Sequence, residues 1–112
     1  MLGFTDIHCH VVPGIDDGAT NLAESVAMAR MAHADGTTFL IATPHQLGKN
    51  CQVTAAAIRK GVADLQTTLA AEGIAVSVLP GADVRIEPEL PKLVKQGKVL
   101  TLADRGKHLL LE

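Results

Sequence analysis

The chain has 112 residues, enough for one domain with one modest hydrophobic core, and we expect residues 1–112 to form it. Its residues are 47% hydrophobic and 20% charged, and the formal net charge of −2 excludes the basic surface expected of a nucleic-acid-binding domain. No apolar run approaches the ~20 residues that cross a bilayer, and the N-terminus lacks signal-peptide features, so we expect a cytoplasmic protein without membrane insertion.

Short apolar runs alternate with helical periods in the first part of the chain. Residues 3–10 are predicted to form a strand, and residues 11–19 a loop rich in Gly and Pro. A helix is predicted to follow, with Asn21 as its N-cap, Glu24 completing a capping box and Gly36 ending it.

The middle of the chain repeats this alternation. Residues 37–43, TTFLIAT, are predicted to form a second strand, and their continuous apolar character is typical of a sheet covered on both faces. After a polar loop, Thr54 can cap a second helix that Gly73 ends, and residues 74–79 are predicted to form a third strand. The apolar stripe of this second helix consists of Ile58, Val62, Leu65 and Leu69.

The last part of the chain adds a helix and a strand. Residues 87–96 are predicted to form a short helix, and residues 109–111 a fourth strand. The resulting β-α-β-α-β-α-β order predicts an α/β fold with parallel strands and helical crossovers. Because the last strand is apolar, we expect a partner strand to bury it.

The strongest chemical signal is the segment Asp6-Ile7-His8-Cys9-His10. Residues two apart in a strand point the same way, so His8 and His10 would aim their imidazoles at one point, as two ligands of one metal ion must. Asp6 shares this parity and could orient a ligand. An HxH spacing can also arise by chance, but the carboxyl end of a strand is where α/β sites form.

Further candidate ligands follow the other predicted strand ends. Asp16 and Asp17 lie in the loop after His10, His45 follows the second strand, Asp83 the third and Glu112 the fourth. Paired acids between glycines can be mere turn formers, and a lone loop histidine is often just solvated. The recurrence of an acid or a histidine at each strand end nevertheless favours one shared site.

This donor set indicates the metal and the nucleophile. Carboxylates mixed with imidazoles suit Mn, Fe or Zn rather than a thiolate site. Two or three such ions can clamp a phosphate and lower the pKa of a bound water to ~7, so the expected nucleophile is a metal-bound hydroxide. Cys9 would face away from the histidines, and no C-x5-R loop follows it. Cys9 and Cys51 are expected to be reduced thiols, and His33 and His108 non-ligands.

The segments TDIHCHVVPGIDDGA, IATPH, GADVRI and HLLLE together resemble the polymerase and histidinol phosphatase (PHP) superfamily. The resemblance is closest to the bacterial capsular and exopolysaccharide tyrosine-protein phosphatases, and DIHCH…PGIDDGA is highly specific to that group. It covers the whole chain but only about the first half of the family's domain. The resemblance therefore implies the amino-terminal half of a distorted (β/α)7 barrel.

The resemblance also implies a chemistry. The family has a trinuclear metal site, most often with manganese, for which Fe, Zn or Mg are alternatives. It hydrolyses phosphotyrosine on the tyrosine kinase that controls polysaccharide export. The ligands that carry over by motif are His8 and His10 for the first metal, Asp83 bridging the first and second, Glu112 for the second, and Asp17 and His45 for the third.

The chain departs from the family pattern in two ways. The family usually has Glu where this chain has Asp83, and the shorter side chain loses ~1.5 Å of reach, so either the backbone moves in or bridging weakens. The family's later histidine, Asp-x-His motif and phosphate-binding arginines are missing. We therefore expect the truncated chain to be weakly active or inactive by itself.

Two alternatives remain open at this point. One is a phosphatase for small metabolites, similar to histidinol phosphatase. The other is a non-catalytic metal-binding fragment that self-associates, because half a barrel leaves two open sheet edges that a homodimer could pair.

Overall fold

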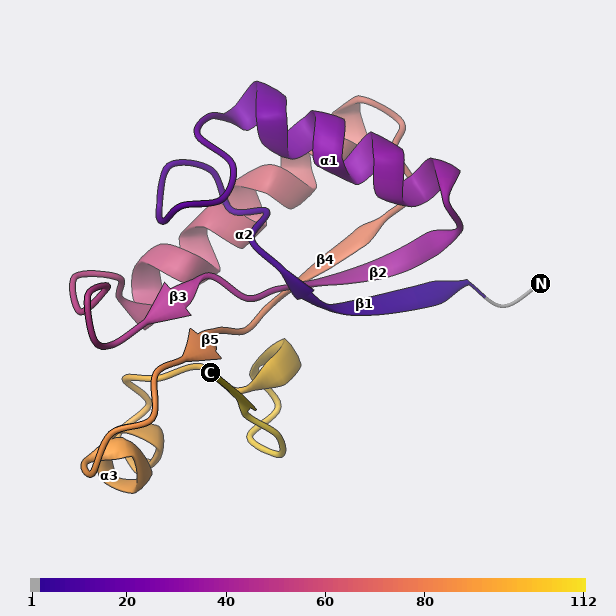
Figure 1. The fold of residues 1–112 in the computed structure, drawn as a ribbon. Helices are drawn as coiled ribbons and strands as arrows, with labels where there is room; N and C mark the ends of the chain where they lie inside the picture. Colours follow the sequence, from indigo (N-terminus) through magenta and orange to yellow (C-terminus); the bar gives the residue numbers. More distant parts are fainter. Residues whose placement is uncertain (1–2) are drawn as a thin grey trace.

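The computed structural model describes residues 3–112 (Figure 1). Its elements in chain order are β1 (Phe4–Cys9), α1 (Leu22–Ala34), β2 (Thr37–Ala42), β3 (His45–Gln46), α2 (Ala55–Ala71), β4 (Ser77–Pro80), β5 (Asp83–Val84), α3 (Leu90–Lys95), the 3₁₀ turn η1 (Leu102–Asp104) and β6 (Leu110–Leu111). All pairings between these strands are parallel, which confirms the predicted α/β fold with parallel strands.

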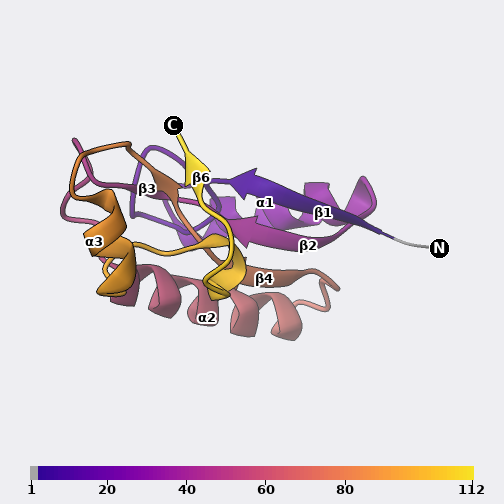
Figure 2. The ribbon, with the colours of Figure 1, turned by 90° about the horizontal axis from the view of Figure 1, so that it is seen from below.

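The strands form two small sheets, of order β1-β2-β4 and β3-β5-β6. Residues 43–44 separate β2 from β3, and residues 81–82 separate β4 from β5, so the chain passes twice from the first sheet into the second. Figure 2 shows β6, which pairs with β5, close to the carboxyl end of β1. The second sheet therefore lies where the strands of the first sheet end.

The predicted caps of the two long helices form. The side chain of Asn21 accepts a hydrogen bond from the Glu24 N–H at 2.9 Å, and that of Thr54 accepts one from the Ala57 N–H at 3.1 Å. The Glu24 carboxylate accepts from the Thr20 hydroxyl. This contact takes the place of the reciprocal bond that a capping box would make to the backbone of Asn21.

Both long helices lie on one side of the first sheet, with α1 against β2 and α2 against β4. The predicted stripe of α2 is buried throughout and packs in one core with Leu40 of β2 and Val78 of β4. The first helix contributes less to this core, because only Ser25 and Ala29 of α1 are fully buried. Across residues 3–112, no helix has the length and apolar character needed to cross a membrane.

The prediction that the sheet is covered on both faces is wrong for the described residues. The side chains of Phe4, Ile7 and Phe39 are 69%, 50% and 44% exposed. The turn Leu102–Asp104 contacts β4 but leaves a groove beside Phe39. The apolar character of residues 37–43 thus reflects one face packed on helices and a second face that is largely open.

The short elements depart from the prediction in their bounds. His45 and Gln46 were expected in a loop, and they form β3 by pairing with β5. The third strand begins at Ser77 rather than at residue 74, and α3 begins at Leu90 rather than at residue 87. Strands of two residues carry no periodicity, so only long-range pairing defines them.

Gln46 explains why β3 is held in place. Its buried amide group donates to the carbonyl oxygens of Val53 and Lys98, both at 3.1 Å, and its oxygen accepts from the Leu100 N–H at 3.0 Å. These bonds join β3 to two segments that are far apart in the sequence. They also fix the backbone position of His45, the neighbouring residue.

We expect Gln46→Leu to lower the free energy of unfolding by about 2–4 kcal/mol, because two buried backbone groups and one part-buried group would lose their partners. Denaturant unfolding followed by circular dichroism measures this change. Gln52→Leu is the matched control, since Gln52 is exposed and its replacement should cost less than about 0.5 kcal/mol. Equal stability of the two variants would show that the Gln46 network contributes nothing.

Candidate metal centre

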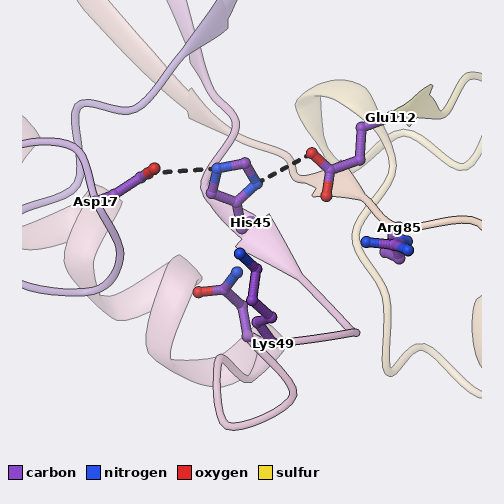
Figure 3. A pocket seen from close by; sticks show the side chains of 6 residues that line it. Asp17, His45, Lys49, Arg85 and Glu112 are labelled. Atoms are coloured by element: carbon purple, nitrogen blue, oxygen red, sulfur yellow. Dashed lines mark ion pairs between the residues drawn. The ribbon is translucent and has the colours of Figure 1, made fainter.

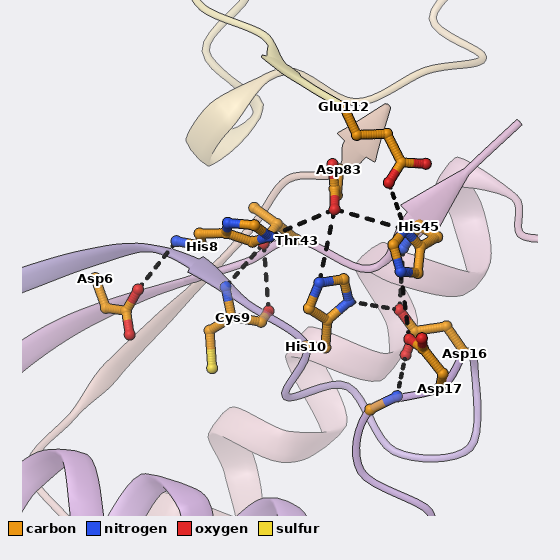
Figure 4. Close-up of polar contacts among 11 residues, drawn as sticks. Asp6, His8, Cys9, His10, Asp16, Asp17, Thr43, His45, Asp83 and Glu112 are labelled. Carbon is orange, nitrogen blue, oxygen red and sulfur yellow. Dashed lines mark hydrogen bonds and ion pairs between the residues drawn. The ribbon is translucent and has the colours of Figure 1, made fainter. Parts of the chain in front are cut away.

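The carboxyl ends of the strands bring all six predicted metal ligands together (Figure 4). They lie at or just after the ends of four strands and in the loop that follows β1. They are His8 and His10 at the end of β1, Asp17 in the next loop, His45 in β3, Asp83 in β5 and Glu112 after β6. Three overlapping groups of ligand atoms result, within each of which the atoms lie within 4.8 Å of one another.

Asp83 lies between three histidine rings. Its Oδ2 is 3.4 Å from Nε2 of His8, 3.7 Å from Nε2 of His10 and 3.5 Å from Nδ1 of His45. The side chain is only 5% exposed. The backbone of β5 places this shorter carboxylate 3.4–3.7 Å from nitrogens of all three rings.

His45 connects Asp83 to the outer part of the site (Figures 3 and 4). Its Nε2 is 3.3 Å from Oδ1 of Asp17, and its Nδ1 is 3.5 Å from Oε2 of Glu112. This Nδ1 atom is buried and has no hydrogen-bond partner among the described residues. A buried ring nitrogen flanked by two carboxylates and left without a hydrogen bond fits a ligand atom that faces a cation.

Asp16 makes contacts of a different kind. Its Oδ2 lies 2.8 Å from Nδ1 of His10 and accepts from the backbone N–H of His45 at 3.0 Å, while its Oδ1 accepts from the Gly18 N–H at 3.0 Å. Burial raises the pKa of Asp16, but the hydrogen bonds from His10, Gly18 and His45 outweigh it and lower the pKa overall. The ionised carboxylate thus holds Nδ1–H of His10 and leaves Nε2 free to ligate.

The nitrogen–oxygen distances distinguish the candidate ligands from Asp16. The nitrogen–oxygen separations around Asp83 and His45 are 3.3–3.7 Å, longer than a hydrogen bond. Two atoms that bind one ion at about 2.1 Å lie roughly 3.0 Å apart at an octahedral ion and roughly 3.4 Å apart at a tetrahedral one. The contact between His10 and Asp16 is a hydrogen bond at 2.8 Å, so the geometry favours Asp17 over Asp16 as a ligand.

His8 and His10 converge although β1 is irregular. Asp6 is opposite Leu40 and Cys9 is opposite Ala42, so β1 carries one extra residue between these pairs. The two imidazole centroids are 5.4 Å apart. Asp6 was expected to orient a ligand, but its carboxylate accepts from the backbone N–H of His8 at 3.0 Å. The carboxylate that contacts a histidine ring is that of Asp16, at His10.

Gly18 allows the ligand loop to fold back onto β1. A Cβ at this position would overlap the carbonyl oxygen of His10. The Ala19 N–H donates to the same carbonyl at 3.2 Å, and the Gly14 N–H donates to the carbonyl of Ala19 at 2.8 Å. The glycine next to the paired acids is therefore required for the close approach that brings Asp16 and Asp17 to the histidines.

Cys9 lies outside the cluster of ligand atoms. Figure 4 shows its sulfur pointing away from Asp83, and the buried Thr43 hydroxyl accepts from its backbone N–H at 2.8 Å. Burial, with a smaller contribution from Asp6, raises the pKa of the Cys9 thiol to about 11. The thiol is therefore protonated at neutral pH. Like Cys9, His33 and His108 lie outside the three groups of ligand atoms.

The donor set fits divalent cations. It combines three imidazoles with three carboxylates that are not used in hydrogen bonds to the rings, and it contains no thiolate. Hard oxygen donors mixed with imidazole nitrogen suit manganese, iron or zinc. Among the described residues, Nδ1 of His45 is buried without a hydrogen-bond partner, and a bound ion would provide that partner.

Comparison with known proteins gives an independent result. A family model described as "Capsular polysaccharide synthesis, CpsB/CapC" matches residues 4–112. Over 107 residues the chain is 39% identical to tyrosine-protein phosphatase YwqE of Bacillus subtilis and 22% identical to putative tyrosine-protein phosphatase CapC of Staphylococcus aureus. Each match covers 96% of this chain and 42% of the relative, so the chain spans less than half the length of these curated relatives.

A solved structure has the same fold in the matched part. It comes from crystal structures of YwqE from Bacillus subtilis and CpsB from Streptococcus pneumoniae, which are described as metal-dependent tyrosine phosphatases. The TM-score is 0.91 at 38% sequence identity, and the match covers 96% of this chain and 43% of that chain.

We expect Asp16→Asn to weaken Mn²⁺ binding by about 10- to 100-fold, as measured by isothermal titration calorimetry. The amide has one oxygen and cannot accept from both Gly18 and the His10 ring, so that ring loses its fixed orientation. Asp64→Asn, on the surface of α2, is the control and should bind Mn²⁺ like the wild type. Wild-type affinity in a folded Asp16→Asn variant would contradict the positioning role.

In metal-free chain at pH 8, we expect iodoacetamide to alkylate Cys51 well before Cys9. Cys51 is exposed, whereas with a pKa of about 11 only roughly one Cys9 thiol in a thousand is ionised at this pH. The thiolate fraction of Cys9 should increase only as the pH rises towards that value. Peptide mass spectrometry measures both rates, and faster labelling of Cys9 would refute its protonated, shielded state.

Proposed function

The chain belongs to the CpsB/CapC family of capsular polysaccharide synthesis, and from this premise we propose that its function is metal-dependent hydrolysis of phosphotyrosine in a protein. The observation that carries the proposal is the buried carboxylate of Asp83, which lies 3.4–3.7 Å from the rings of three histidines. The relative YwqE is a tyrosine-protein phosphatase, and the relative CapC is a putative one. The activity, substrate and partner of this chain are proposed by extension from these longer proteins.

We propose manganese as the metal, with iron, zinc or magnesium as alternatives, and up to three ions in the complete site. The overlapping groups of ligand atoms support more than one ion, because Asp83 belongs to two of them and His45 also to two. The proposed ligands are His8 and His10 for the first ion, Asp83 between the first and second, Glu112 for the second, and Asp17 and His45 for the third.

The chain's own residues prepare the site for a phosphate ester. Cations bound there would supply a water of lowered pKa and would offset the charge of the phosphoryl oxygens. Asp16 holds the Nδ1 proton of His10, so the lone pair of Nε2 faces Asp83. Because Cys9 is protonated and points away, the proposal contains no covalent intermediate on a cysteine.

The proposed substrate is a phosphotyrosine protein, namely the tyrosine kinase that controls polysaccharide export, with the reaction in the cytoplasm. The cleft beside His45 has a volume of ≈ 750 Å³, a size suited to a side chain as large as phosphotyrosine. Asp17 and Glu112 line the same cleft. A phosphoryl group entering it would therefore meet the proposed ligands directly.

We also propose that residues 1–112 form the amino-terminal half of a PHP-type distorted (β/α)7 barrel. Support comes from the open apolar face beside Phe39 and from the match to 43% of a longer solved chain. The edge strands of the first sheet, β1 and β4, support an alternative, in which two chains associate as a homodimer through their sheet edges. A monomeric mass in solution at high concentration would contradict the homodimer.

With chain in excess over substrate, we expect slow, Mn²⁺-dependent release of phosphate from a phosphotyrosine peptide. Malachite green detection of phosphate measures it. The His45→Ala variant should fall to the background rate, because it removes both ring nitrogens that face Asp17, Asp83 and Glu112. His33→Ala, on α1 and outside the ligand groups, is the matched control and should keep the wild-type rate.

Histidinol phosphate tests the competing small-metabolite activity in the same assay. Release from histidinol phosphate as fast as from the peptide would contradict the proposed substrate class. Release that does not need a metal would contradict the proposed chemistry. Vigorous multiple turnover would contradict only the expectation that this chain alone is weakly active.

A further inference from the structure

Two cationic side chains, those of Lys49 and Arg85, line the cleft beside the ligand cluster, and the proposed hydrolysis does not use them. Figure 3 shows Lys49 below His45 and Arg85 on the side of Glu112, and both side chains line the cleft together with His45. Asn50 completes the lining. The question is what these two cations bind.

Arg85 continues the strand that carries Asp83. Its backbone N–H donates to the carbonyl of Gln46 at 3.1 Å, so the β5 pairing extends to this residue. Residues two apart in a strand point the same way and are roughly 6.6 Å apart. Arg85 therefore leaves the sheet on the side of Asp83, one step farther from the ligand atoms.

Lys49 is held next to Arg85 by a tight turn. The Asn50 N–H donates to the Leu47 carbonyl at 3.0 Å, and Gly48 takes a positive φ of 59°. The Cγ of Arg85 lies 3.3 Å from the position that a Cβ would take at Gly48, so the stem of Arg85 packs on this turn. The stem of Arg85 and the turn that carries Lys49 therefore lie side by side.

Neither Lys49 nor Arg85 has an ion-pair partner within residues 3–112. The ion pairs of arginine and lysine there are Arg30 with Glu72, Arg59 with Asp104, and Lys60 with Asp64. Both Lys49 and Arg85 are exposed, and the carboxylates of the cleft face His45 instead. Two adjacent cations without a counter-ion are available for an anionic group on a ligand.

We infer that Arg85 and Lys49 bind the carboxylate of an acidic residue next to the phosphotyrosine of a peptide substrate, an inference that rests on the proposed function. The phosphoryl group would lie at Asp83 and His45, one strand step away from Arg85. The cleft volume of ≈ 750 Å³ leaves room beyond it for a neighbouring side chain. Arg85 and Lys49 are thus specificity-determining residues and take no part in the hydrolysis.

Two peptides test this inference by fluorescence anisotropy in Mn²⁺ buffer. Both carry a non-hydrolysable phosphonate analogue of phosphotyrosine, flanked by glutamates in one and by glutamines in the other. We expect the wild type to bind the glutamate peptide about three- to tenfold more tightly, the range for two partly exposed ion pairs. In Arg85→Gln/Lys49→Gln the ratio should fall to about one, with affinity for the glutamine peptide unchanged.

A matched control removes the same charge elsewhere. Arg30→Gln/Lys60→Gln changes two cations on the outer surfaces of α1 and α2, so it should keep the wild-type preference. The charge reversal Arg85→Glu/Lys49→Glu should instead favour a lysine-flanked peptide. Such a reversal would not follow from a merely structural role of the two residues.

The other outcomes overturn the inference. Equal binding of both peptides by the wild type would do so while leaving the proposed function intact. So would an equal loss of affinity for both peptides in Arg85→Gln/Lys49→Gln, which would mean that the cations bind the phosphoryl group. If the wild type binds neither peptide in the presence of Mn²⁺, the proposed function itself fails and this inference fails with it.

Discussion

The site depends on one carboxylate, that of Asp83, which is buried between the rings of His8, His10 and His45. Removing a carboxylate from water is costly unless its charge is compensated. A divalent cation would compensate this charge and would also occupy the spaces of 3.3–3.7 Å between nitrogen and oxygen. Many local features of the chain serve to hold these donors close together. They include the extra residue in β1, the close approach at Gly18 and the fixed ring of His10.

Sequence patterns predicted the parts of the fold that depend on local interactions. The stripe and the cap of α2 follow from helical periodicity and from Thr54, and both are present. The convergence of histidines and acids followed from a geometric rule, because parallel strands end at the same edge. The role of Asp16 could not be predicted in this way, since the backbone of His45, one of its partners, is 29 residues away. The two-residue strand β3 also escaped prediction, because it depends on bonds from Gln46 to segments up to 54 residues away.

In our proposal, one cleft serves both chemistry and recognition. The cleft is lined by the carboxylates of Asp17 and Glu112 and the ring of His45, and also by Arg85 and Lys49, which have no ion-pair partner among the described residues. The pairing of His45 with Asp83 joins β3, and the turn after it that carries Lys49, to β5, which Arg85 follows. The match to the CpsB/CapC family model, over residues 4–112, includes every strand end that contributes to this site.

Anomalous diffraction from crystals grown with Mn²⁺ tests the central claim most directly. The account predicts ion peaks in contact with the Asp83 carboxylate and with nitrogens of His10 and His45, and with Asp16 hydrogen-bonded to Nδ1 of His10 rather than bound to an ion. Absence of peaks from this cluster, or an ion bound by Asp16 with the His10 ring released, would contradict it.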